Sequence, residues 1–167
     1  MGFAAVTKSF QDKEVFDVPL YQNGSNVQTV VKAFLSHHIS WNDSYSVGVR
    51  QLDEHHKRLF SIINEACDAC ARGNYKAFPL ILDELLDYVL YHFEAEEKYM
   101  IAIKYPELEA HQIEHQQFAE KLIGYHRMVQ ENNQLFSIKL IDLTHYIYKW
   151  WCEHILKKDM QFSGTSF

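Results

Sequence analysis

Two pairs of residues in this sequence have the types and the spacing of metal ligands. His92 and Glu96 are four residues apart in "HFEAEEKYM", and His111 and His115 are four residues apart in "HQIEH". Each pair lies on one face of a helix, because residues four apart stand above one another. Imidazole and carboxylate together suit iron and similar metals. Either pair alone is common on a solvated helix, but two pairs on consecutive helices favour one shared metal site.

Apolar neighbours place both pairs at the edge of an interior helix face. An apolar stripe accompanies His92 and Glu96 on their helix, formed by Leu82, Leu85, Leu86, Val89 and Phe93. On the next helix, Phe118 shares the side of His111 and His115. Burying a carboxylate on such a face is costly unless it is paired or bound to a metal.

Four long amphipathic segments carry these side chains. Apolar residues recur every three or four positions, and Gly73-Asn74 gives the first helix an end signal. Pro79 suits the first turn of the second helix, Pro106 starts the third, and Asn132-Asn133 ends it. We expect helices at residues 53–72, 78–104, 106–131 and 135–158. With short connections and no competing strand pattern, the prediction is an all-α, up-down-up-down antiparallel four-helix bundle.

The N-terminal part has a different pattern. Its first twenty or so residues have no clear period and predict an extended arm, while "GSNVQTVVKAFLSHH" predicts a short amphipathic helix. Ser25 and Gln28 have the spacing of a capping box, and His37 and His38 end this helix where its dipole favours positive charge. We expect the helix to dock on its own bundle, in a monomer, or on a partner copy, in a homodimer. The predicted division is an extension at 1–40, a bundle at 41–162 and a tail at 163–167.

Composition narrows the classes of partner. The formal net charge of -6 argues against non-specific binding to nucleic acid or to anionic membranes. The chain has no apolar run of the length that spans a bilayer and no secretory signal pattern, so we expect a cytoplasmic protein. Three cysteines are too few for a disulfide framework, and we interpret the C-x-x-C pair Cys67 and Cys70 as packing. Ten histidines point toward metal or proton chemistry.

The first and fourth helices offer further ligand types, and the whole set carries a family resemblance. The segments "QLDEHHKRLF", "HFEAEEKYM", "KYPELEAHQIEH" and "WWCEHILKKD", in this order, resemble the hemerythrin family from about Trp41 to Asp159. The resemblance implies a non-haem di-iron centre inside the bundle, with two oxo- or hydroxo-bridged iron ions. The ligands that it implies are His56, His92, Glu96, His111, His115, His154 and Asp159.

The same resemblance distributes these ligands between two ions. His111, His115 and His154 would hold one iron and His56 and His92 the other, with Glu96 and Asp159 bridging and one position left open for O₂. His56 is the first-helix ligand because Lys57 follows it, so His55 takes the place of a glutamine. Asp159 is five residues after His154, which is about 140° around a regular helix, so we expect the helix to distort or end there.

Three aromatic residues are expected to line the O₂ pocket. Phe60 is four residues after His56 and shares its face, and Phe93 follows His92 and matches a family aromatic. Trp151 stands three residues before His154, where family members often have an aliphatic residue. Its larger ring predicts a restricted pocket, or else an N–H that reaches a bound oxygen or a water; core packing is the alternative for all three.

Reversible O₂ binding without catalysis, for transport, storage or supply, is the function that the resemblance implies. Ferritin-like oxidases are the main rival, but they use Glu-x-x-His pairs, and no histidine of this chain has a glutamate three residues before it. Three alternatives stay open. The chain could sense oxygen, iron or redox state through a partner, carry out peroxide or nitric oxide chemistry at the same di-iron site, or hold zinc or no metal.

Overall fold

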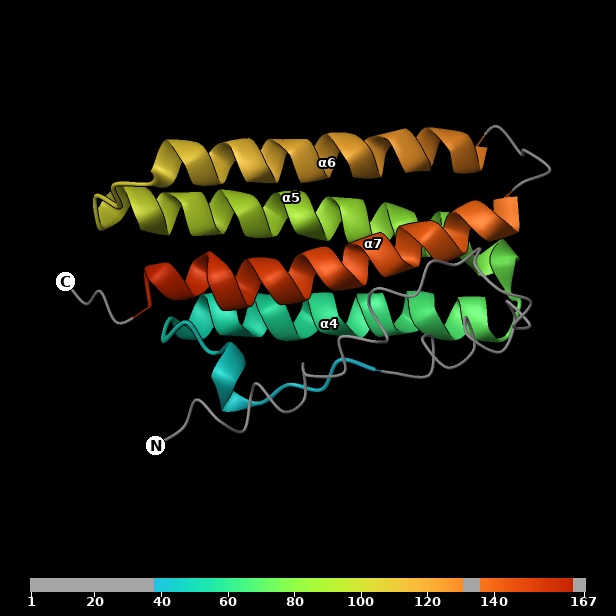
Figure 1. Cartoon of the computed structure of the whole chain (residues 1–167), viewed down its shortest axis with the longest axis horizontal. Helices are drawn as coiled ribbons and strands as arrows, with labels where there is room; N and C mark the ends of the chain where they lie inside the picture. Colours follow the sequence, from blue (N-terminus) through green and yellow to red (C-terminus); the bar gives the residue numbers. More distant parts are fainter. Residues whose placement is uncertain (1–37, 131–135, 164–167) are drawn as a thin grey trace, which may run out of the picture.

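Four long helices lie side by side and alternate in direction along the chain (Figure 1). The computed structural model describes residues 38–130 and 136–163. Its helices are α4 (Arg50–Ala71), α5 (Phe78–Ala102), α6 (Leu108–Gln130) and α7 (Phe136–Lys157), with short 3-10 helices η1 (Asp43–Tyr45), η2 (Tyr75–Ala77) and η3 (Asp159–Gln161). Within these residues no strand occurs, so the all-α, up-down-up-down prediction is confirmed.

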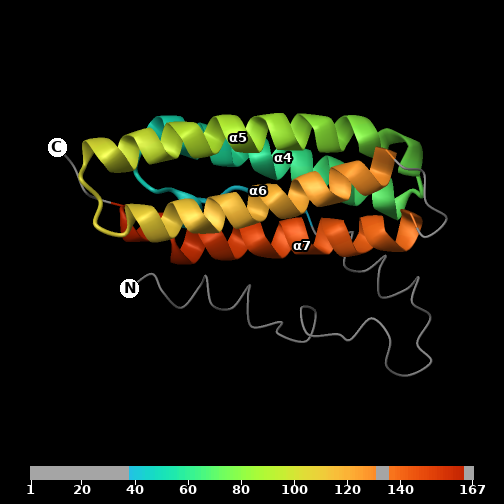
Figure 2. The same cartoon turned by 90° about the horizontal axis from the view of Figure 1, so that it is seen from above.

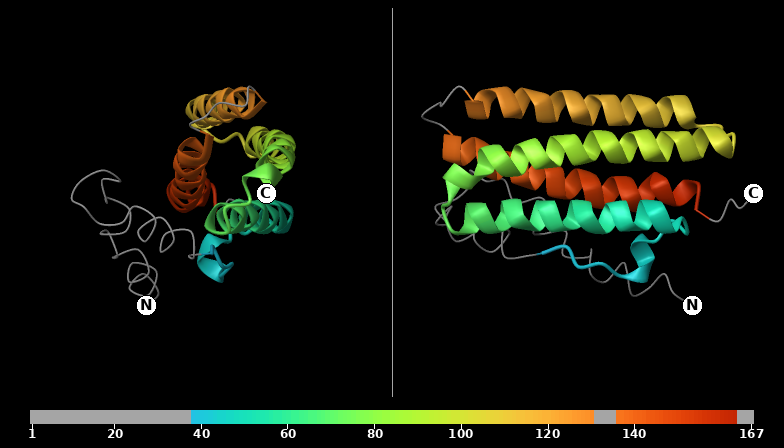
Figure 3. Two further views of the ribbon diagram at one scale, coloured as in Figure 1. Left: turned by 90° about the vertical axis from the view of Figure 1, so that its right-hand side faces the viewer. Right: turned by 180° about the vertical axis from the view of Figure 1, so that it is seen from behind.

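Seen end-on, the four helices stand at the corners of a square (Figure 3). α4 packs beside α5 and α7, and α6 completes the square between α5 and α7. Because neighbours in sequence are antiparallel, the starts of α4 and α6 meet the ends of α5 and α7 at one end of the bundle (Figure 2). Side chains from these four helix ends can therefore converge on one point in the interior.

α4 begins three residues earlier than the apolar pattern predicts. Its N-cap, Val49, makes no capping hydrogen bond through its side chain. Instead Asp53, in the first turn, accepts hydrogen bonds from the Val47 backbone N–H at 2.9 Å and from the Ser46 hydroxyl at 2.6 Å. A carboxylate near a helix N-terminus is stabilising, so this contact with the preceding loop supports a turn that periodicity alone does not mark.

The other helix boundaries follow the predicted signals closely. Gly73 has a φ of 65°, and its N–H donates to the Cys70 carbonyl at 3.0 Å, which ends α4 where predicted. Pro79 lies in the first turn of α5, also as predicted. α6 begins at Leu108 and not at Pro106, because the chain first makes a turn in which Lys104 has a φ of 55°. The predicted end of α6 at Asn132-Asn133 lies outside the described residues.

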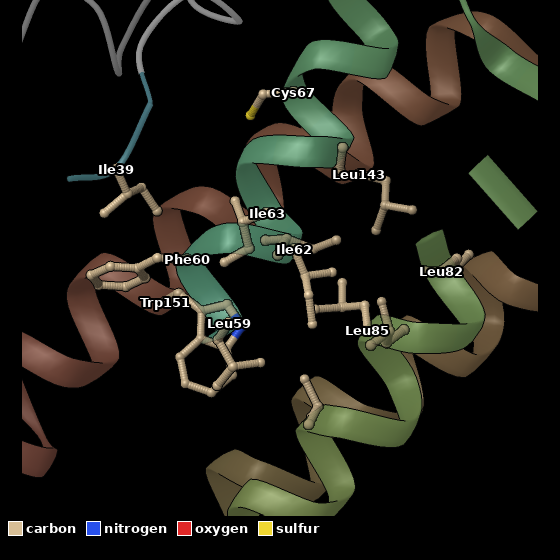
Figure 4. Packing of buried hydrophobic residues seen from close by; sticks show 14 of the residues in the cluster. Ile39, Leu59, Phe60, Ile62, Ile63, Cys67, Leu82, Leu85, Leu143 and Trp151 are labelled. Carbon is tan, nitrogen blue, oxygen red and sulfur yellow. The ribbon is translucent and has the colours of Figure 1, made fainter. Parts of the chain in front are cut away.

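The apolar faces of the four helices meet in one main core (Figure 4). Leu59, Ile62 and Ile63 of α4 and Leu82 and Leu85 of α5 belong to it, and all five are at most 1% exposed. The cysteines belong to this core: all three are buried and free, and burial raises the pKa of Cys67 and Cys152 to about 12 and that of Cys70 to about 11. The interpretation of the C-x-x-C pair as packing is thus confirmed.

A segment before the bundle, residues 38–49, runs along α4 (Figure 1). Its backbone is held at Ile39, whose N–H donates to Asn64 Oδ1 at 2.8 Å and whose carbonyl accepts from Asn64 Nδ2 at 2.9 Å. His38 lies 2.9 Å from Asp68. The predicted arm, its capping box and His37 lie outside the described residues. None of the helices that the structure describes is long and apolar enough to cross a membrane.

Replacing Asn64 with alanine should loosen this segment. The backbone N–H and carbonyl of Ile39 would both lose their hydrogen-bond partner in a partly buried place, which typically costs about 1–3 kcal/mol. Urea denaturation of the full chain measures the change in the free energy of unfolding. Ser61→Ala, an exposed position one turn earlier on α4, is the control and should change it little. Equal stability of the two variants would contradict the anchoring role of Asn64.

Candidate metal centre

Five imidazoles and two carboxylates meet at the end of the bundle where four helix ends come together. All seven side chains are buried, with exposures from 0% to 4%. His56 comes from α4, His92 and Glu96 from α5, His111 and His115 from α6, His154 from α7 and Asp159 from η3. The seven residues that the sequence resemblance assigns are therefore brought together in space.

Three of the histidines form a tight group. His154 Nε2 lies 3.1 Å from His115 Nε2 and 3.1 Å from His111 Nε2. With metal–nitrogen bonds of about 2.1 Å, two nitrogens bound at right angles to one ion are about 3.0 Å apart. The three nitrogens are thus spaced as ligands on one side of a single metal ion.

His56 and His92 form a second, smaller group. Their ring centroids are 4.9 Å apart, and neither Nε2 has a hydrogen-bond partner among the described residues. Glu96 stands between the two groups: its Oε2 lies 3.2 Å from His115 Nε2 and 3.7 Å from His92 Nε2. This carboxylate can therefore reach metal ions in both positions.

Asp159 joins the two groups with separate oxygens. Its Oδ1 lies 3.2 Å from His154 Nε2, and its Oδ2 lies 3.5 Å from His56 Nε2. The carboxylate reaches the interior because α7 ends at Lys157 and η3 begins with Asp159. The expected helix end between His154 and Asp159 is confirmed.

The electrostatics of the site fit bound cations. Burial lowers the pKa of His56 to about 4 and that of His92 well below its usual value, so both rings are neutral and can bind metal. Burial, with the charge of Glu96, raises the pKa of Asp159 well above its usual value. The oxygens of both carboxylates are buried without a hydrogen-bond partner among the described residues. Both carboxylates can be ionised together only with nearby positive charge, which metal ions would supply.

His55 is buried beside the site but outside the ligand group. Its ring packs against Tyr91 at 4.8 Å and Tyr88 at 6.0 Å between centroids, and it lies 5.8 Å from the His92 ring. The His56 ring, one residue on, is the one whose nitrogen faces Asp159. On α4 the geometry thus favours His56 over His55 as the ligand.

Two of the three expected pocket residues border the ligands. The Phe93 ring is stacked on His115, with centroids 3.6 Å apart and planes 8° apart. The Trp151 ring is fully buried, 5.3 Å from the His92 ring and 6.4 Å from the His56 ring. Its Nε1 has no hydrogen-bond partner among the described residues. Trp151 therefore lies beside the two-histidine group, where the sequence places it.

Phe60, the third expected pocket residue, faces a different neighbourhood. Its ring packs against Tyr45 at 5.0 Å and Trp41 at 6.2 Å, and Figure 4 draws it on the side of α4 where Ile39 lies. Although Phe60 is four residues after His56, its ring packs against the segment before α4. Its place in an O₂ pocket stays a prediction.

Several residues around the ligands were not singled out from the sequence. Glu97 Oε1 lies 2.9 Å from His115 Nδ1, and Glu114 Oε2 lies 3.5 Å from His154 Nδ1. The Trp150 ring is stacked on His154 with centroids 4.1 Å apart. In the sequence, Glu97 and Glu114 each stand next to a ligand residue. That position alone does not predict a contact with a ligand histidine, because the helix that each acid faces depends on how α5, α6 and α7 pack.

Replacing His56 should remove a metal ligand, whereas replacing its neighbour should not. His56→Ala leaves Asp159 Oδ2 without its facing nitrogen and is expected to lower the iron bound per chain to about half or less, because ligand loss leaves the ion undercoordinated. His55→Ala is the matched control and should retain wild-type iron. Elemental analysis after anaerobic reconstitution measures both. The reverse pattern would show that the α4 register is wrong.

Comparisons with known proteins show the family of the chain. The family model described as the hemerythrin HHE cation binding domain matches residues 47–164. A bacteriohemerythrin of Clostridium acetobutylicum is 28% identical over 127 residues, covering 73% of this chain and 96% of that protein. A hemerythrin-like protein of Naegleria gruberi is 32% identical over 126 residues, covering 75% and 92%. The crystal structure of a wild-type hemerythrin superposes with a TM-score of 0.65 and 26% identity, covering 76% of this chain and 96% of that one. The chain belongs to the hemerythrin family.

Proposed function

We propose that this protein binds O₂ reversibly at two iron ions, held by the five histidines and by the two carboxylates as bridges. Hemerythrins bind non-haem iron and are generally O₂-binding proteins rather than enzymes. Reduced iron supplies the electrons that O₂ binding requires, which imidazole and carboxylate groups cannot supply themselves.

One observation carries the proposal: the two ligand groups share carboxylates but have unequal numbers of histidines. Glu96, His111, His115 and His154 form one group of closely spaced ligand atoms, and His56, His92 and Glu96 form the other. An ion with fewer protein ligands keeps a coordination position open, as a ligand-binding metal requires. An ion held by His56 and His92 would therefore be the one with the open position.

The residues around this side can keep it dry. Trp151 and Phe93 place apolar rings beside His92, at 5.3 Å and 5.8 Å between centroids. An apolar wall would exclude water and slow proton access to the place where O₂ would bind. This role separates a carrier from an oxidase, which must deliver protons to the same place.

The small number of carboxylates among the proposed ligands favours binding over further oxidation. Only two of the seven proposed ligands are carboxylates, whereas ferritin-like oxidases use four. Less negative charge stabilises highly oxidised iron less well. Apart from Glu96 and Asp159, no acidic residue is buried among the described residues.

The deciding experiment combines metal analysis with absorption spectra of the reduced full-length protein before and after exposure to air. We expect about two iron ions per chain and a visible absorption band that appears in air and disappears when O₂ is removed. A colourless protein containing zinc would overturn the proposal. Irreversible oxidation with release of peroxide would instead favour the oxidase alternative.

Shortening the side chain at position 151 should speed O₂ entry. Trp151→Leu removes an indole that borders both His56 and His92, and we expect the O₂ association rate to rise roughly tenfold, which corresponds to a barrier lower by about 1.4 kcal/mol. Rapid mixing of the reduced protein with O₂ measures it. Trp41→Leu is the control, because this ring packs against Tyr45 and Phe60. Equal rates in all three proteins would leave Trp151 a packing residue.

A further inference from the structure

One carboxylate outside the seven ligands makes a direct contact with a ligand histidine. Glu97 Oε1 lies 2.9 Å from His115 Nδ1, across the contact between α5 and α6. The other oxygen, Oε2, accepts a hydrogen bond from Gln112 Nε2 at 2.8 Å. Both oxygens of Glu97 are therefore held by α6, and the carboxylate has a fixed orientation.

This contact determines which nitrogen of His115 can bind a metal. When Nδ1–H donates to the carboxylate, the proton is held on the outer nitrogen and the Nε2 lone pair faces the interior. Nε2 is the atom that lies 3.1 Å from His154 Nε2 and 3.2 Å from Glu96. A carboxylate in this position also makes the imidazole a stronger electron donor to a metal.

The two-histidine group has no comparable support. The Nδ1 atoms of His56 and His92 are buried and have no hydrogen-bond partner among the described residues. The rings of His55 and His56 lie beside His92, and both are imidazoles, not carboxylates. On the other side of the site, Glu114 Oε2 lies 3.5 Å from His154 Nδ1 without forming a hydrogen bond, and Glu114 is itself paired with Lys158.

We propose that Glu97 is a positioning residue that makes the three-histidine position the tighter of the two metal positions. The inference rests on the proposed function, because it requires metal ions in both groups. Its consequence is an order of loss: the ion between His56 and His92 leaves first, and the ion held by His111, His115 and His154 leaves last. The part of the centre with the open position is then also the part that loses its metal more readily.

The test follows iron release from the reconstituted, reduced full-length protein into an excess of a coloured ferrous chelator. Wild type should release iron in two phases. Glu97→Leu removes both the hydrogen bond and the charge, and should speed the slow phase about tenfold, the low end of the range typical when a group supporting a ligand histidine is lost. Glu97→Gln keeps a hydrogen-bond acceptor but loses the charge, so its slow-phase rate should lie between those of wild type and Glu97→Leu. Glu94→Leu, an exposed position on α5, is the matched control and should release iron like wild type.

The same change made in a His92→Ala variant tests whether the slow phase comes from the three-histidine position. His92→Ala disrupts the two-histidine group, so the chain should retain about one iron, and adding Glu97→Leu should speed the release of that iron. If the added change had no effect, the tighter position would not depend on Glu97 and the inference would be overturned.

Thermal melting of the metal-free proteins distinguishes a role of Glu97 in folding from its role at the metal position. We expect metal-free Glu97→Leu and Glu94→Leu to melt at the same temperature. If metal-free Glu97→Leu melted at a lower temperature than metal-free Glu94→Leu, and this loss of stability accounted for the faster iron release, Glu97 would be a packing residue and the inference would be overturned. Wild type that binds no iron would contradict the proposed function itself, whereas normal iron binding with unchanged release in Glu97→Leu would contradict only the inference.

Discussion

The most demanding feature of this molecule is the burial of two carboxylates, Glu96 and Asp159, in one interior. Both are fully buried, and their oxygens find no hydrogen bond among the described residues. Isolated buried charges cost several kcal/mol each unless cations compensate them. Burial lowers the pKa values of His56, His92 and His154, so these three rings do not supply that charge by protonation. Against the effect of burial, hydrogen bonds to Glu96 and Glu97 raise the pKa of His115, which can offset part of the negative charge. Metal ions would supply the rest.

The bundle topology meets the need by joining four helix ends. His92 and Glu96 lie late in α5 and His111 and His115 early in α6, so a short turn between the helices brings the pairs together. Asp159 can enter only because α7 stops after His154; a continued helix would turn residue 159 about 140° away. Helix termination is thus a requirement of the metal site as much as a feature of the fold.

Sequence reasoning reaches the features that depend on local spacing. The helices, the stop at Gly73 and the inward faces of His92 and His111 follow from periodicity and turn chemistry, and the structure agrees. Features that depend on contacts between elements are different. The early start of α4 relies on Asp53 reaching back to the preceding loop, and the contact of Glu97 with His115 relies on the packing of α5 against α6. Neither contact follows from a regular spacing of residues, so neither could be predicted from the sequence alone.

The aromatic rings around the ligands reinforce the difference between the two halves of the site. Phe93 lies flat on His115 and Trp150 lies flat on His154, with interplanar angles of 8° and 15°. Flat stacking restrains these imidazoles from rotating, in addition to the acids at their outer nitrogens. Trp151 meets His92 at 55° and leaves the two-histidine side with steric contact but no such restraint. In the function that we propose, the half with the restrained rings would retain its ion and the more adaptable half would border the pocket. That division suits reversible binding, because an incoming ligand needs room on one side while the other side holds the centre in place.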